Sequence, residues 1–105
     1  MGSVLGEEMI HEYGLILKPQ EIPINDPRSR YLFTTQPFVA TPSALNIYGQ
    51  EVITGCLAYL QRQARQYNGI DYLQVFEDLE KGRSDLWFID DGEGGATTAL
   101  LPEDY

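Results

Sequence analysis

The stretch that decides the fold is TPSALNIYGQEVITGCLAYLQRQARQYNG, residues 41–69. Apolar residues recur in it every three or four positions, as they do on one face of a helix, and polar residues fall on the other face. This spacing predicts one amphipathic helix of about seven turns. Its apolar positions are Leu45, Tyr48, Val52, Cys56, Tyr59 or Leu60, Ala64 and Tyr67.

Both ends of this helix are marked in the sequence. Thr41 suits the N-cap, because its hydroxyl can accept from a free backbone N–H, and Pro42 suits the first helical position. Asn68 followed by Gly69 supplies a left-handed stop. Inside the helix, Gly49 and Gly55 each lower the stability by about 1 kcal/mol relative to Ala. Either glycine also leaves room for the close approach of another backbone segment.

Five short segments around this helix are predicted to be strands, because apolar and polar residues alternate in them or because they are rich in β-branched and aromatic residues. Prolines at every fourth position make residues 19–29 a connector or a ragged edge strand. We therefore predict a single domain over residues 1–105, an α+β fold in which one long helix packs on an antiparallel sheet of about four to five strands. The last three strands should form a meander, and residues 102–105 should be frayed. The predicted strands are 12–18, 30–38, 71–78, 85–90 and 96–101.

The hairpin formed by 71–78 and 85–90 is apolar on both faces. In the first strand Leu73 and Val75 alternate with Tyr72 and Phe76, and in the second Trp87 alternates with its apolar neighbours. A single helix covers only one face of a sheet. We therefore expect either the N-terminal segment or a partner, such as a second copy of the chain in a homodimer, to cover the other face.

The net charge of −9 is unevenly distributed along the chain. Residues 70–105 carry −8 of it, because they hold ten acidic and only two basic residues. Affinity for a phosphate backbone comes from Lys and Arg, so we expect no direct binding of nucleic acid. The acidity fits a basic protein partner, or simply keeps the protein soluble.

The residue types that carry most catalysis are scarce. His11 is the only histidine and has no second histidine to form a zinc site. Cys56 falls on the apolar face of the helix, where a thiol behaves as a small hydrophobic group. The acidic turn 90–95 does not match the spacing of a calcium loop, and no phosphate-binding glycine motif is present. We expect neither an enzyme nor a bound cofactor or metal.

Two features bear on the compartment. No stretch of about 18 apolar residues is present, so we expect no membrane-spanning helix. Residues 1–10 lack the basic and apolar regions of a signal peptide. We therefore expect a cytoplasmic protein.

Two strings in the chain resemble a known group. Residues 30–34 (RYLFT) are followed by a long helix and then by residues 71–77 (DYLQVFE). Over residues 30–90 this order resembles a family of small uncharacterised proteins, a domain of unknown function, in Gram-positive bacteria and their mobile elements. The resemblance implies a bacterial cytoplasmic source and carries no catalytic activity.

We therefore expect a non-enzymatic accessory protein that binds another macromolecule. The alternative is an inhibitor from a phage or mobile element whose acidic surface imitates nucleic acid. In either case the expected binding surface is an acidic rim around aromatic side chains between residues 77 and 93, where we also count Phe88 as an aromatic anchor. Its members are Glu77, Asp78, Glu80, Asp85, Trp87, Asp90, Asp91 and Glu93.

Overall fold

The helix predicted from residues 41–69 is present as α1 (Pro42–Tyr67) in the computed structural model, which describes residues 9–10 and 13–105. Thr41 caps it as expected, since its hydroxyl oxygen accepts from the backbone N–H of Ala44 at 3.2 Å. At the other end Asn68 adopts the left-handed conformation, with φ of 59°. Both helix boundaries are therefore set by local sequence.

The two glycines of α1 have specific roles that helix propensity does not describe. Gly49 has φ of 83° and ψ of 159°, which breaks the helical path and divides α1 into two segments at a kink. Gly55 is helical, but a Cβ at this position would lie only 2.3 Å from the hydroxyl oxygen of Tyr13. The close approach at Gly55 is thus made by a side chain and not, as expected, by another backbone segment.

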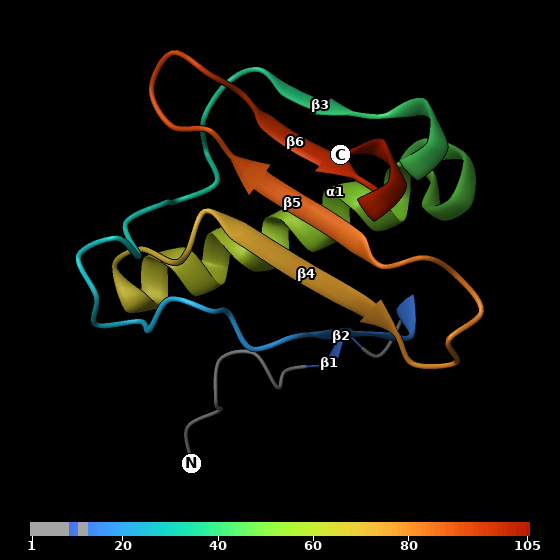
Figure 1. The fold of residues 1–105 in the computed structure, drawn as a ribbon, viewed down its shortest axis with the longest axis horizontal. Helices are drawn as coiled ribbons and strands as arrows, with labels where there is room; N and C mark the ends of the chain where they lie inside the picture. Colours follow the sequence, from blue (N-terminus) through green and yellow to red (C-terminus); the bar gives the residue numbers. More distant parts are fainter. Residues whose placement is uncertain (1–8, 11–12) are drawn as a thin grey trace.

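The strands form a six-stranded sheet in the order β1-β2-β4-β5-β6-β3 (Figure 1). The last three strands along the chain make the expected antiparallel meander, β4-β5-β6. The predicted α+β fold is therefore confirmed, with two departures: the sheet has six strands instead of four to five, and β3 pairs with β6 in parallel, which makes the sheet mixed. The strands are β1 (Met9–Ile10), β2 (Leu15–Leu17), β3 (Phe38–Ala40), β4 (Leu73–Asp78), β5 (Leu86–Asp90) and β6 (Thr97–Leu100).

The strand predicted over residues 30–38 is wrong for most of its length. In this segment Tyr31 makes only an isolated bridge to Ile70, and the strand proper begins at Phe38. The cause is Phe33, which is fully buried with φ of 60°. A positive φ cannot continue an extended strand, so the chain turns there to place the ring in the core.

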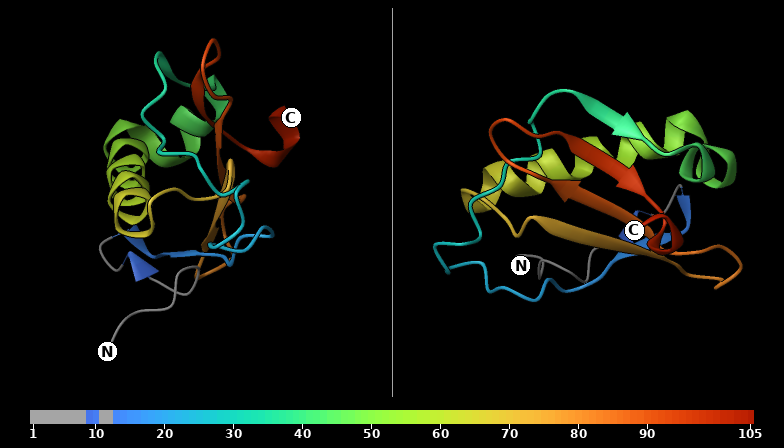
Figure 2. Two further views of the ribbon diagram at one scale, coloured as in Figure 1. Left: turned by 90° about the vertical axis from the view of Figure 1, so that its left-hand side faces the viewer. Right: turned by 45° about the horizontal axis from the view of Figure 1, so that its top comes forward.

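The core lies between the sheet and α1 (Figure 2). Phe76 on β4 is paired with Leu86 on β5, and both are fully buried. The ring of Phe88 lies 5.7 Å from that of Phe76 in an edge-on contact. Leu15 and Leu17 of β2 extend this layer. The buried residues of α1 are Ala44, Tyr48, Ile53, Cys56, Leu60, Gln63 and Ala64.

The opposite face of the sheet carries no helix comparable to α1 in the part of the chain that the structure describes. We call it the open face and define it by the residues that alternate with the core layer: Leu73, Val75, Trp87, Ile89, Thr98 and Leu100. On this side lies the short 3-10 helix η2 (Pro102–Asp104), which appears on the far side of the sheet from α1 in Figure 2.

The expectation that residues 102–105 are frayed is wrong. The Oδ2 atom of Asp104 accepts hydrogen bonds from the hydroxyl of Thr41 at 2.7 Å and from the backbone N–H of Leu101 at 3.0 Å. The ring of Tyr105 lies 5.7 Å from that of Trp87. These contacts hold the segment against the start of α1 and the edge of the open face.

Candidate functional site

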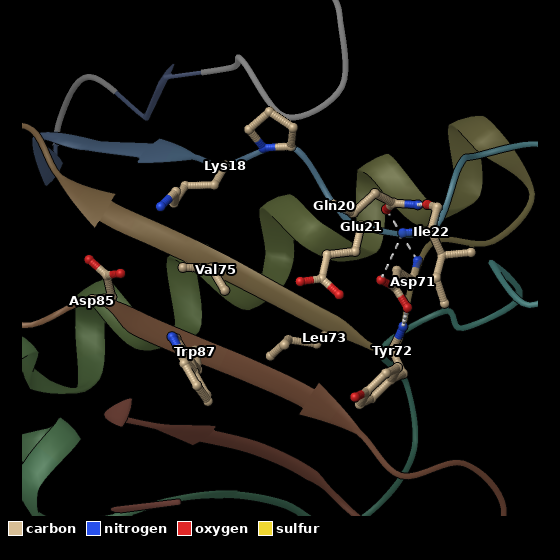
Figure 3. Close-up of a pocket in the computed structure, with 11 residues that line it drawn as sticks. Lys18, Gln20, Glu21, Ile22, Asp71, Tyr72, Leu73, Val75, Asp85 and Trp87 are labelled. Carbon is tan, nitrogen blue, oxygen red and sulfur yellow. Dashed lines mark hydrogen bonds between the residues drawn. The ribbon is translucent and has the colours of Figure 1, made fainter. Parts of the chain in front are cut away.

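A pocket of about 300 Å³ lies on the open face, between the segment that follows β2 and strand β5 (Figure 3). Its floor is apolar and is formed by Leu73 and Val75 of β4 with Trp87 of β5, all of them half-buried. One wall is made by residues 18–22 and the other end by Asp71 and Tyr72. The connector predicted at 19–29 thus lies beside the open face and leaves the pocket between them.

The wall of this pocket is held by a network of hydrogen bonds around two polar side chains. The amide oxygen of Gln20 accepts from the backbone N–H of Asp71 at 3.2 Å and from the side chain of Gln74 at 3.0 Å. In return, the carboxylate of Asp71 accepts from the backbone N–H of Ile22 at 3.4 Å and of Tyr72 at 2.7 Å. Asp71 is therefore a buried structural carboxylate.

The rim of the pocket is charged. Lys18, Glu21 and Asp85 border the apolar floor together with Asp71 (Figure 3). Neither Glu21 nor Asp85 makes a side-chain hydrogen bond or ion pair with any residue that the structure describes. Two carboxylates that make no such bond therefore lie beside an aromatic and aliphatic floor.

Two of the predicted site residues are structural, so the acidic rim as expected from the sequence is not formed. Asp78 is only 5% exposed and pairs with Arg83 at 3.1 Å, and its pKa is lowered chiefly by that hydrogen bond. Asp90 is only 3% exposed and accepts three hydrogen bonds: from the backbone N–H of Phe33 and Gly92, and from the hydroxyl of Thr35. Both carboxylates face the protein interior.

The remaining acidic residues are divided between the two ends of β5. Glu77 pairs with Lys81 at 2.6 Å, and Glu80 is exposed in the same turn. Asp91 and Glu93 are exposed in the loop beyond the far end of β5 (Figure 1).

Asp85 and Trp87 of the predicted set meet in the pocket on the open face. Phe88, which we expected to stand beside Trp87 as an aromatic anchor, is fully buried on the α1 side.

A second hollow of about 350 Å³ lies at the far end of β5. It is bordered by Tyr31 and Leu32, which precede β3, and by Asp90 and Glu93. The guanidinium of Arg30 lies 4.9 Å from the centre of the Tyr31 ring, over its face. Because the carboxylate of Asp90 already accepts three hydrogen bonds, this hollow offers a ligand fewer carboxylates without such bonds than the pocket on the open face does.

Cys56 adds no chemistry to either hollow. Cys56 is fully buried in α1, and burial raises the pKa of its thiol to about 12. His11 lies outside the described residues. Within residues 9–10 and 13–105, no three His, Cys, Asp or Glu side chains are grouped so that they could hold a metal ion. In the same part of the chain, no helix is both long and apolar enough to cross a membrane.

Sequence reasoning missed the residues that complete the pocket, namely Lys18, Gln20 and Glu21. The prolines at 19, 23 and 27 identified this segment as a connector, but a connector carries no periodicity that indicates its position in space. The one available signal was the doubly apolar hairpin, which required some segment or partner to lie on its second face.

Comparisons with protein-family models, curated proteins and solved structures found no match to this chain. The resemblance over residues 30–90 therefore stays a prediction.

Proposed function

We propose that the protein is a non-enzymatic accessory protein that binds another macromolecule through its open face. The observation that carries this proposal is the pocket, in which an apolar floor at the centre of the sheet is bordered by the unpaired carboxylates Glu21 and Asp85. A half-buried Trp at such a position is the type of side chain that dominates binding energy in interfaces. The bacterial cytoplasmic source implied by the resemblance belongs to the same proposal.

A binding role is favoured over a catalytic one by the state of the reactive groups. Nucleophilic catalysis needs a side chain activated by a lowered pKa or by a neighbouring base. The thiol of Cys56 is shifted in the opposite direction and is enclosed in the core. In the pocket itself, Asp71 is held by backbone hydrogen bonds.

A photo-cross-linking amino acid placed at two positions tests this proposal. Val75 lies on the open face, whereas Thr54 is exposed on α1, on the other side of the sheet. The Val75 position should yield a specific cross-linked partner in the native host, and the Thr54 position should not. The purified partner should then bind the unmodified protein and compete with the cross-link. Equal cross-linking from both positions would contradict the proposal.

The acidic mimic of nucleic acid is the alternative, and the charge of −8 over residues 70–105 is what favours it. A mimic should compete with DNA for its partner, with a strong dependence on salt, because both ligands would use the same basic surface. An ordinary accessory protein should not compete. A homodimer is the other outcome, and it would appear as a cross-link between two copies of the chain and as a dimer in sedimentation.

A further inference from the structure

The charged groups on the rim of the pocket indicate the sign of the charge that its occupant carries. Three carboxylates and one ammonium group line it, and Glu21 and Asp85 are the two carboxylates without a side-chain hydrogen bond or ion pair among the described residues. Asp85 has a weaker electrostatic interaction with Lys81, which contributes to the raised pKa of that lysine. The ammonium group of Lys18 also interacts with a carboxylate that does not line the pocket. The pKa of Glu77 is lowered mainly by its hydrogen bond from Lys81 and to a smaller extent by Lys18. The rim therefore favours a cation.

The floor indicates the shape of the same occupant. Lys and Arg carry a long apolar stem that ends in a charged group, and they often lay this stem along an apolar surface. Trp is also the aromatic side chain that attracts a cation most strongly. The ring of Trp87 lies 5.7 Å, between centroids, from that of Tyr105 at the border of this floor. A floor of this kind beside unpaired carboxylates matches both ends of a basic side chain.

We infer that this pocket binds a short basic segment of a protein partner. The stems of its Lys or Arg residues lie on the floor formed by Leu73, Val75 and Trp87, and their charged groups lie beside Glu21 and Asp85. This inference rests on the proposed function and adds the chemistry of the partner to it. It also replaces the acidic rim expected from the sequence with a smaller site, to which residues 18–22 contribute.

Three fluorescent heptapeptides test the inference against the full chain: GLRLRLG, its neutral counterpart GLQLQLG and its acidic counterpart GLELELG. Anisotropy titrations are compared at about 0.01 M and about 0.15 M salt, between which the Debye length shortens from about 30 to about 8 Å. The basic peptide should bind at least about tenfold tighter than the neutral one at low salt, since two charges are engaged. This preference should decrease at the higher salt concentration.

Charge variants then locate the site on the surface. Asp85→Asn and Glu21→Gln should each weaken binding of the basic peptide about threefold at low salt. Glu51→Gln is the matched control, because it makes the same change of charge at an exposed position of α1. Glu51→Gln should change the free energy of peptide binding by less than half as much as either of these substitutions. Circular dichroism confirms that each variant remains folded.

Lys18→Gln tests the sign directly. It removes a positive charge from the rim, so it should strengthen binding of the basic peptide about twofold. Weaker binding in this variant, a preference for the acidic peptide, or equal effects of Glu51→Gln and Asp85→Asn would each overturn the inference. If the basic peptide shows no preference while a partner still cross-links at Val75, the inference fails and the proposed function stands. If, in addition, no partner cross-links at Val75, both the inference and the proposed function are contradicted.

Discussion

The carboxylate of Asp90 accepts a hydrogen bond from the backbone N–H of Phe33 at 3.0 Å, across 57 residues of sequence. The same carboxylate accepts from the hydroxyl of Thr35 at 2.6 Å and from the backbone N–H of Gly92 at 2.8 Å. It thereby fixes the segment before β3, which contains Phe33 and Thr35, to the end of β5. It also satisfies the N–H of a buried residue whose positive φ excludes it from the sheet ladder.

Replacing Asp90 with Ala should therefore lower the free energy of unfolding by about 3 kcal/mol, because it leaves buried donors without an acceptor. Urea unfolding followed by the fluorescence of Trp87 measures this change. The matched control is Asp91→Asn, a change of the neighbouring exposed aspartate, which should alter stability by no more than about 0.5 kcal/mol. Similar effects of the two substitutions would show that Asp90 acts only through net charge.

Asp104 should make stability depend on pH in the acid range. Hydrogen bonds from the hydroxyl of Ser43, the backbone N–H of Leu101 and the hydroxyl of Thr41 hold the pKa of Asp104 below its ordinary value of 3.8. A carboxyl group with a lower pKa in the folded state stabilises the fold above its unfolded pKa. This contribution is lost as the pH falls through the folded value. Stability should therefore decline from about pH 4 downward.

Asp104→Asn should reduce this decline, and unfolding in urea at a series of pH values measures it. The variant should be less stable than the unmodified protein at neutral pH, and the two should converge as the pH falls. Glu103→Gln controls for net charge, since it removes a charge from the same turn and leaves the three hydrogen bonds of Asp104 in place. Curves that stay parallel through the acid range would contradict a stabilising role for these bonds.

Gly55→Ala should destabilise the protein despite the higher helix propensity of Ala. The added Cβ would lie within 3 Å of three atoms of the Tyr13 side chain, so overpacking should cost about 1–3 kcal/mol. Thr54→Ala, at the preceding exposed position of α1, is the control and should change stability by no more than about 0.5 kcal/mol. Thermal unfolding measures both. A more stable Gly55→Ala variant would mean that Tyr13 moves away without cost.

Gly49→Ala should also be destabilising, for a different reason. The backbone at this position has φ of 83° and ψ of 159°, a conformation that only glycine adopts readily, although open space surrounds it. The expected loss is about 1–3 kcal/mol. Thermal unfolding and the helical signal in circular dichroism measure it. A gain in both would indicate that the two segments of α1 join into one continuous helix.

The thiol of Cys56 should be unreactive in the folded protein. The thiolate is the reactive form, and the pKa of Cys56 is raised to about 12 by burial. A disulfide reagent at about pH 8 should modify it at least about a thousandfold more slowly than in denaturant, because exposure requires opening of the core. A cysteine introduced by Thr54→Cys should react rapidly. Fast modification of Cys56 itself would show that the α1 interface opens readily.

The candidate site could be predicted only in part, and the reason is physical. Alternation along the hairpin places Trp87 opposite the core layer, since the side-chain period of a strand is two. The same alternation places Asp78 and Asp90 on the core side with Phe76 and Phe88. We nevertheless expected both aspartates at the surface, because they are charged. A carboxylate can be buried where it is paired or hydrogen-bonded, and its partners are distant in sequence. The number of acidic residues in the sequence therefore overestimated the number of carboxylates exposed at the surface.

The sequence by itself determined the elements whose causes are local. The caps and periodicity of residues 41–69 are sufficient to define α1, and the turns that follow define the meander β4-β5-β6. Tertiary structure alone decided the path of residues 18–37 and the docking of η2. The chain turns at Phe33, instead of continuing as a strand, because the ring of Phe33 is buried in the core. Glu21 lies at the open face because the hydrogen bonds of Gln20 and Asp71 fix the connector there. Such choices depend on contacts between distant residues, which no local pattern encodes.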